Sequence, residues 1–128
     1  MILYINTVLN DEIIIALYNK KKLIAEKKII APRQQAEKLL PAIDKLLKAK
    51  KIKLSELEKI SVENYGGSFT ALRIGVITAN ALAYALKIPV EAKSKTAKKN
   101  KKFGAYSIVE PVYDREPNIG ISKKLLVH

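Results

Sequence analysis

The sequence of 128 residues contains no cysteine and a single histidine, at its last position. Disulfide bonds and thiolate metal sites are therefore excluded, and His128 has no neighbours with which to form a Ser-His-Asp set or a histidine-rich cluster. The apolar stretch beginning at Met1 lacks the regions of a signal sequence, and no apolar run is long enough to cross a bilayer. We expect a cytoplasmic protein without a membrane span, and we predict no metal and no cofactor.

Arginine is also scarce, because lysine supplies all but three of the 24 basic residues behind the net charge of +12. Lysine attracts phosphate as a point charge and lacks the planar fork of arginine, so this composition indicates diffuse attraction to polyanions without sequence readout. A genome biased toward lysine codons explains the same excess equally well. With 48% apolar and 28% charged residues, the chain should form one globular core.

Hydrophobic periodicity predicts one α/β domain in which three antiparallel strands precede a strand-helix-strand unit. Apolar, β-branched runs predict strands at residues 1–6, 12–18, 23–30, 59–64 and 88–91. Helical spacing predicts helices at residues 32–47, where Pro41 should bend the helix or break one turn, and at 69–86. Ser55 and Glu58 have the spacing of a capping box. The later strands should pair in parallel through right-handed crossovers.

The second predicted helix is apolar on nearly every side and needs cover on more than one face. One side carries the small residues Ala71, Gly75, Ala79 and Ala83, and another carries Ile74, Ile77, Ala81, Tyr84 and Ala85. One row should cover the sheet and the other a protein partner, but the sequence does not assign them. The alternative that both rows are buried within the monomer stays open.

The turn Gly66-Gly67-Ser68 before this helix has two interpretations. Free amides and the helix dipole at such a junction favour an anion. The simpler interpretation, a turn followed by an N-cap serine, is preferred because no P-loop lysine follows.

Residues 93–104 are rich in lysine and read as a linker, and order should return in a tail over residues 105–128. The linker either is a solvated tether or follows RNA phosphates. The second interpretation assigns RNA contact to Lys95, Lys98, Lys99, Lys101 and Lys102.

Two stretches, APRQQAEKLLP at residues 31–41 and GSFTALRIGV at residues 67–76, resemble the TsaB family. TsaB proteins are non-catalytic partners in the bacterial synthesis of threonylcarbamoyladenosine, a tRNA modification beside the anticodon. The predicted element order is also that of the amino-terminal lobe of the actin, sugar-kinase and Hsp70 (ASKHA) superfamily. The resemblance implies a single ASKHA lobe, ribonuclease H-like, with a five-stranded mixed sheet and two main helices.

A second match, EPVYDREP at residues 110–117, resembles the carboxy-terminal end of TsaB proteins. We therefore expect an amino-terminal lobe at residues 1–92, the linker at 93–104 and a TsaB-like tail at 105–128, without most of a second lobe.

The chain departs from the family in three places. Asn6 stands where the superfamily usually has an aspartate that helps to place metal and phosphate, and an amide cannot supply that charge. Ala71 replaces a usual glycine, and the family's Gly-Pro-Gly turn appears as Tyr65-Gly66-Gly67. Without an interlobe cleft to enclose a nucleotide, we expect no ATP hydrolysis by this chain alone.

By resemblance, the two helices should bind a TsaD-like catalytic subunit and activate it by population shift. The expected interface comprises Leu39, Leu40, Ile43, Leu47, Leu72, Arg73, Gly75, Val76, Ala79, Asn80 and Ala83. A TsaE-like ATPase, tRNA bound through the complex, and a homodimer formed by the same helices are further expected partners. The alternatives are a basic RNA-binding module that acts independently of TsaD and a degenerate sugar-kinase-like enzyme.

Overall fold

The computed structural model describes residues 1–9, 11–93, 101–103, 106–110 and 112, and the side chains of Phe69 and of residues 101–108 are not described. The seven strands are β1 (Ile2–Asn6), β2 (Glu12–Asn19), β3 (Lys22–Ile30), β4 (Lys59–Val62), β5 (Val90–Ala92), β6 (Lys101–Phe103) and β7 (Tyr106–Ile108). The helices are α1 (Gln35–Ala49), the short 3₁₀ helix η1 (Leu54–Glu56) and α2 (Phe69–Leu86).

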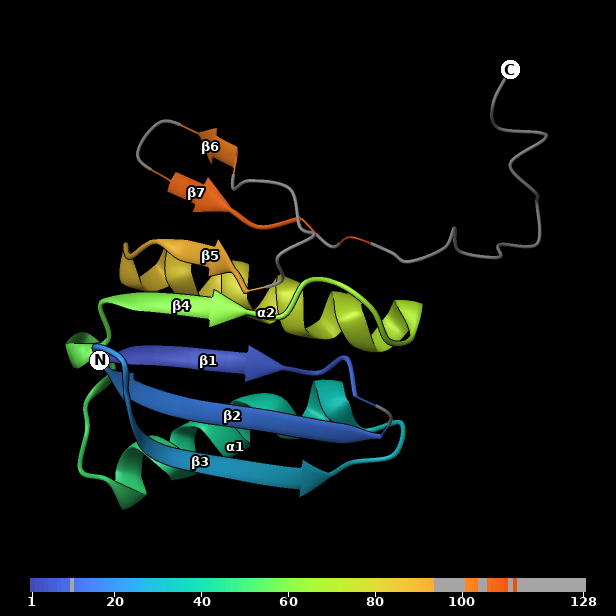
Figure 1. Ribbon diagram of the computed structural model, residues 1–128, viewed down its shortest axis with the longest axis horizontal. Coiled ribbons are helices and arrows are strands. Elements are labelled where there is room, and N and C mark those ends of the chain that lie inside the picture. Colours follow the sequence, from blue (N-terminus) through green and yellow to red (C-terminus); the bar gives the residue numbers. More distant parts are fainter. Residues whose placement is uncertain (10, 94–100, 104–105, 111, 113–128) are drawn as a thin grey trace.

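The first five strands form one mixed sheet in the order β3-β2-β1-β4-β5 (Figure 1). β1 pairs antiparallel with β2, and β2 with β3, as short connections allow. β4 pairs in parallel with β1 and β5, and the connections through α1 and α2 supply the long crossovers that parallel pairing requires. The predicted α/β fold with a five-stranded mixed sheet, the order of its elements along the chain and the bounds of the second helix are confirmed.

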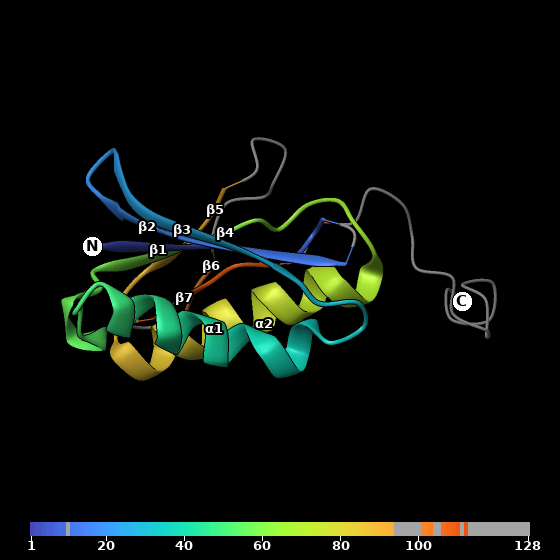
Figure 2. The same cartoon turned by 90° about the horizontal axis from the view of Figure 1, so that it is seen from below.

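Both helices cover the same face of this sheet, and none of the described residues forms a helix on the other face (Figure 2). Alternate residues of β1 and β2, among them Leu3, Ile5 and Ile15, point toward the helices and are fully buried. The buried stripe of α1 and the inner side of α2 complete one core against them. The small pair β6 and β7 lies beyond the β5 edge of the sheet (Figure 1).

Both helices end in the same backbone motif, with lysine where glycine is usual. At the end of α1, Ile52 N–H donates to Leu47 O over 2.9 Å and Lys51 N–H to Lys48 O over 3.1 Å. At the end of α2, Ile88 N–H donates to Ala83 O over 3.0 Å, and Lys87 N–H donates to Tyr84 O over 3.2 Å. This is the Schellman pattern, and its left-handed residues are Lys51 (φ 56°) and Lys87 (φ 58°).

Three local predictions were wrong. Helix α1 begins at Gln35 and not at Pro32, because residues 32–34 form a turn in which Arg33 has a φ of 58°. The same helix runs through Pro41, so the broken turn, one of the two effects predicted for this proline, does not occur. The carboxylate that caps η1 is Glu56, whose Oε1 accepts from Lys53 N–H over 3.0 Å, and not Glu58.

Candidate protein-interaction site

The loop after β1 holds α2 close to the sheet. Thr7, which is fully buried, donates its hydroxyl to Ala71 O over 2.5 Å. A Cβ at Gly75 would lie 2.5 Å from that hydroxyl oxygen, so only glycine fits here without a shift. Gly67 has a φ of 71°, and a Cβ there would overlap the backbone carbonyl of Val8. Ser68 caps the helix by accepting from Ala71 N–H over 3.1 Å, which confirms the predicted N-cap.

These contacts decide which row of α2 faces inward. Ala71, Ala79 and Ala83 are buried beneath the sheet together with Gly75, so the small-residue row gives close approach to the chain's own strands. The second row faces outward: Ile74 is half-buried, and Ile77 and Tyr84 are exposed.

The expected interface is corrected accordingly. Eight of its residues lie in the core or inner helix layer and present no surface in this structure: Leu39, Ile43, Leu47, Leu72, Gly75, Val76, Ala79 and Ala83. Helical spacing identified apolar residues correctly, but both rows of α2 are apolar, so spacing alone could not separate inner from outer residues. Only Leu40 and Arg73 of that set are exposed.

An apolar strip remains exposed on the outer side of the helix layer. Leu40 is 53% exposed, Ile77 56% and Tyr84 60%, and each is a large apolar or aromatic side chain. Beside this strip, a groove of about 330 Å³ runs between the start of α1 and the first half of α2, lined by Ala36, Thr70, Arg73, Ile74, Ile77 and Thr78. We call the strip and the groove the outer helix surface.

Asn80 was expected at the partner interface, but it holds residue 109 instead. Its Nδ2 donates to Val109 O, and its Oδ1 accepts from Val109 N–H, both over 2.8 Å. Val109 is 2% exposed, so its side chain belongs to the core. The carboxamide thus pairs with backbone as a neighbouring strand would.

Asn64 secures the next residues of the same segment. Its Nδ2 donates to Glu110 O over 2.7 Å, and Val112 N–H donates to Asn64 O over 2.6 Å. The start of the predicted tail therefore packs on the lobe after β4, where Tyr65 and Val112 form a parallel bridge. The sequence did not indicate Asn64 at all and did not indicate this role of Asn80, because the partners of the two residues lie 29 to 48 residues away.

The face of the sheet opposite α1 and α2 carries a partly buried polar cluster. Tyr4 donates its hydroxyl to Glu63 Oε2 over 2.8 Å, and Asn6 Nδ2 donates to the Tyr4 oxygen over 3.1 Å. Burial and the Glu63 carboxylate raise the pKa of Tyr4 well above its ordinary value. Asn6 Oδ1 accepts from Val8 N–H over 2.9 Å, so both ends of this amide serve local structure.

The predicted RNA contacts fall mostly outside the described residues. Lys95, Lys98 and Lys99 are not described, and Lys101 and Lys102 belong to β6 without described side chains. Within the described part of the chain, no helix is long and apolar enough to span a membrane.

Residues 17–94 match the model of a family described as TsaD: tRNA N6-adenosine threonylcarbamoyltransferase. The chain belongs to this family. The matched stretch runs from the middle of β2 past the end of β5 and includes both helices. The TsaD family model therefore covers the elements that build the outer helix surface.

Curated proteins that are similar in sequence to this chain carry two different names. A "tRNA threonylcarbamoyladenosine biosynthesis protein TsaB" of Bacillus subtilis is 36% identical over 80 residues, which cover 62% of this chain and 35% of the relative. A "tRNA N6-adenosine threonylcarbamoyltransferase" of Protochlamydia amoebophila is 40% identical over 60 residues, covering 47% of this chain and 18% of the relative. The chain thus spans about a third of the TsaB relative.

Solved structures agree with the TsaB resemblance. The structure of YeaZ from Pseudomonas aeruginosa superposes with a TM-score of 0.67 and 30% identity, covering 75% of this chain and 44% of that one. A second structure, an uncharacterized protein with similarity to peptidase YEAZ from the same organism, gives a TM-score of 0.68 at the same coverage. The similarity to TsaB and YeaZ and the ASKHA-type α/β fold expected from the sequence are confirmed.

Proposed function

We propose that this chain is a non-catalytic subunit that acts in threonylcarbamoyladenosine modification of tRNA by binding a TsaD-type enzyme through its outer helix surface. The observation that carries the proposal is the exposed strip of Leu40, Ile77 and Tyr84 beside the groove between α1 and α2. Large apolar side chains gathered on one face are typical of a protein interface. The relatives' names supply the pathway, and a role on tRNA implies the expected cytoplasmic location.

A non-catalytic role is supported by what Asn6 does. This residue replaces the acidic group expected at the end of the first strand, and its amide is engaged with Tyr4 and with Val8 N–H. A carboxylate in this position could not donate to the tyrosine oxygen. The chain's own residues therefore use this position for structure, and binding is the activity that the outer helix surface favours.

The test is association with a TsaD-type subunit, measured by calorimetry or co-purification. Ile77→Glu places a charge in the centre of the outer helix surface, and we expect it to weaken association at least about tenfold, because burying an unpaired carboxylate is costly. Since Ile77 is 56% exposed, thermal stability should stay close to that of the parent chain. Buried positions such as Val76 and Ala79 are unsuitable, because a charge there would unfold the core.

Ile30→Glu is the matched control. Ile30 is 61% exposed and lies on β3, away from the helix layer, so the same substitution there should leave association unchanged. Equal weakening by both substitutions, or no association of the parent chain, would refute the proposed interface.

The same experiment separates the remaining alternatives. A chain that binds tRNA but not the TsaD-type subunit would be a basic RNA-binding module acting independently. If the parent chain has twice the mass of one copy in solution and the Ile77→Glu variant has the mass of one copy, the chain forms a homodimer through the same helices. Recruitment of a TsaE-type ATPase is tested by adding that protein to the preformed complex and measuring whether it co-purifies.

A further inference from the structure

We propose that one end of the molecule, built by the β2–β3 turn and the ends of the two helices, binds the phosphate backbone of RNA. We call it the basic end. It comprises residues 18–23, 44–58 and 87–89. The inference deepens the proposed function, on which it rests, by naming a surface of this chain for the RNA substrate.

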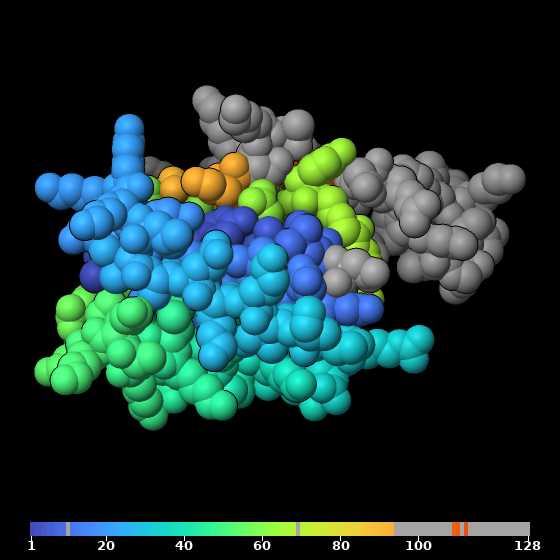
Figure 3. Space-filling view, turned by 60° about the horizontal axis from the view of Figure 1, so that its bottom comes forward, coloured from blue at the N-terminus to red at the C-terminus, as the bar shows by residue number. Residues whose placement is uncertain are grey.

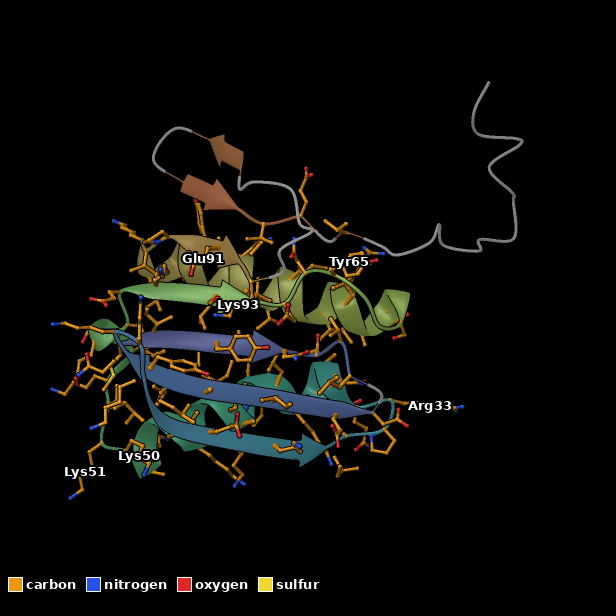
Figure 4. All side chains as sticks on the ribbon, viewed as in Figure 1. Arg33, Lys50, Lys51, Tyr65, Glu91 and Lys93 are labelled. Carbon is orange, nitrogen blue, oxygen red and sulfur yellow. The ribbon has the colours of Figure 1, made fainter. Side chains whose placement is uncertain are left out.

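Strand register brings these three segments together. Ile2 pairs with Tyr18 and with Lys59, so the β2–β3 turn and the starts of β1 and β4 lie at the same end of the strands. Ile60 pairs with Val90, which adds the start of β5 and the preceding end of α2. Figure 4 labels Lys50 and Lys51, from the connection after α1, at this same end.

The charge of the basic end is far from balanced. Its residues include nine lysines, all exposed, against the three acidic residues Asp44, Glu56 and Glu58. In the space-filling view, long side chains of the β2–β3 turn (blue) and of the α1–η1 connection (green) project from it (Figure 3). A surface with six excess positive charges attracts a polyanion at long range.

Among the residues that the structure describes, the opposite end of the lobe is close to balanced. Residues 7–9, 11–12, 30–38, 63–73 and 93 contain the four acidic residues Asp11, Glu12, Glu37 and Glu63 and the four basic residues Arg33, Lys38, Arg73 and Lys93, and Glu110, which is bound by Asn64, adds a further carboxylate. Codon bias would enrich lysine at exposed positions of both ends alike. Codon bias alone therefore does not explain why the excess positive charge is concentrated at one end.

Some lysines of the basic end have a local role, but this does not account for the set. Lys48 and Lys87 lie at helix C-termini, where a positive charge offsets the helix dipole. Lys20 and Lys21 form the turn of a hairpin and have no such role. Three of the turns also hold lysine in the left-handed region: Lys20 (φ 59°), Lys51 (φ 56°) and Lys87 (φ 58°).

Glycine or asparagine would adopt this left-handed conformation at lower cost than lysine does. The sequence thus keeps a positive charge at three positions where the backbone favours a neutral residue. Asp11 (φ 55°) and Arg33 (φ 58°) adopt the same conformation at the opposite end, so the proposal depends on the charge asymmetry, and the left-handed lysines are positions where asparagine can replace the charge without strain.

RNA fits this surface better than a membrane does. The lysines come from three separate segments that together form a broad end, whereas binding to a lipid surface usually relies on one amphipathic helix. Lysine without arginine suits sequence-independent contact with phosphates. The basic end should therefore hold the tRNA backbone while base recognition occurs elsewhere.

The test measures binding of an unmodified tRNA transcript by the full chain and by its complex with the TsaD-type subunit, from 50 to 300 mM salt. Lys20→Asn with Lys51→Asn removes two charges, and asparagine suits both left-handed positions, so the fold should be preserved. We expect at least about tenfold weaker binding at low salt and a salt slope reduced by about 1 to 2, because each phosphate contact contributes roughly 0.7 to 0.9.

Lys27→Gln with Lys28→Gln is the matched control, since it removes two exposed charges from the middle of β3. We expect less than about threefold weakening from this pair. Equal weakening by both pairs, or no tRNA binding by chain or complex, would overturn the proposal. The proposal would also be overturned if Lys20→Asn with Lys51→Asn weakened binding to phosphatidylserine vesicles but left tRNA binding unchanged. Association with the TsaD-type subunit, unchanged by either pair, keeps failure here distinct from failure of the proposed interface.

Discussion

Gly75 and Thr7 illustrate how a single atom decides the packing of α2. Gly75→Ala would gain about 1 kcal/mol of helix propensity, but its Cβ would meet the Thr7 hydroxyl 2.5 Å away. Overpacking costs about 1–3 kcal/mol and also disturbs the bond from Thr7 to Ala71 O. We therefore expect a net loss of about 1–2 kcal/mol in the free energy of unfolding, measured by urea titration.

The second substitution Thr7→Ala tests the cause. It removes the hydroxyl that Gly75→Ala would strike, so the double variant should be more stable than the sum of the two single losses. Strictly additive losses would show that the two residues do not interact.

Lys87 offers a prediction in the opposite direction. Lys87→Gly relieves a left-handed residue at the end of α2, and we expect a gain of about 0.5–1 kcal/mol in unfolding free energy. Lys48→Gly, within the last turn of α1, has regular helical neighbours and should instead cost about 1 kcal/mol. Thermal unfolding of the two variants compares them directly, and a loss of stability in both would refute the cost assigned to lysine in this conformation.

Tyr4 predicts a stability change at high pH. In the unfolded chain a tyrosine ionises near pH 10, whereas burial and Glu63 raise the pKa of the folded Tyr4 hydroxyl. The stabilisation is thus complete below about pH 10 and is lost as the pH rises further, by at most about 1.4 kcal/mol per pH unit for one proton. Tyr4→Phe should flatten the fall in unfolding free energy between about pH 9.5 and 11.5, and parallel profiles would contradict this account.

At the scale of elements, the spacing of apolar residues predicted those helices and strands that depend on interactions between residues close in sequence. Three hairpin-connected strands, the parallel order of β1, β4 and β5, and the bounds of α2 follow from periodicity and connection length. The start of α1 and the cap of η1 did not, because several residues nearby could serve as a first turn or a cap. The inward row of α2 depends on Thr7, which lies 64 residues from its hydrogen-bond partner Ala71.

The candidate site was therefore predicted only in part. The choice of helices as an exposed apolar element agrees with the positions of Leu40 and Ile77, while most of the residues named for it proved to be core. Asn80 reads in the sequence as a polar position on a helix edge, and only the fold brings residue 109 against it. Distant backbone partners leave no signal in the spacing of nearby residues.

The two hydrogen bonds of Asn80 should hold the segment after β7 against α2. Asn80→Asp removes the donor to Val109 O and places a carboxylate beside that carbonyl. We expect a loss of about 1–3 kcal/mol in unfolding free energy and at least about tenfold faster hydrogen exchange at the Val109 amide. Asn19→Asp, the same change in an exposed residue at the end of β2, should alter neither. Unchanged protection of Val109 in the Asn80 variant would show that other contacts hold the segment.

At the scale of the whole molecule, the two proposed surfaces differ in chemistry, and they adjoin only at Tyr84, whose carbonyl accepts from Lys87 N–H. The groove of the outer helix surface lies between the start of α1 and the first half of α2, whereas the basic end contains the last turn of α1 and the residues that follow α2. Apolar burial depends weakly on ionic strength, but contacts between lysine and phosphate weaken steeply with salt. One small lobe could therefore hold a protein and an RNA at once, without competition between them.

This separation gives a prediction that neither surface gives alone. Raising salt from 0.1 to 0.5 M should change association with the TsaD-type subunit by less than about threefold and abolish most tRNA binding by the isolated chain. Ile77→Glu should lose the first interaction and keep the second, while Lys20→Asn with Lys51→Asn should do the reverse. Measuring both affinities for each variant completes the comparison. If Ile77→Glu weakened tRNA binding as much as the lysine pair does, a single shared surface would have to replace the two proposed surfaces, because one added charge at the groove should reduce the attraction of the basic end less than the loss of two of its lysines.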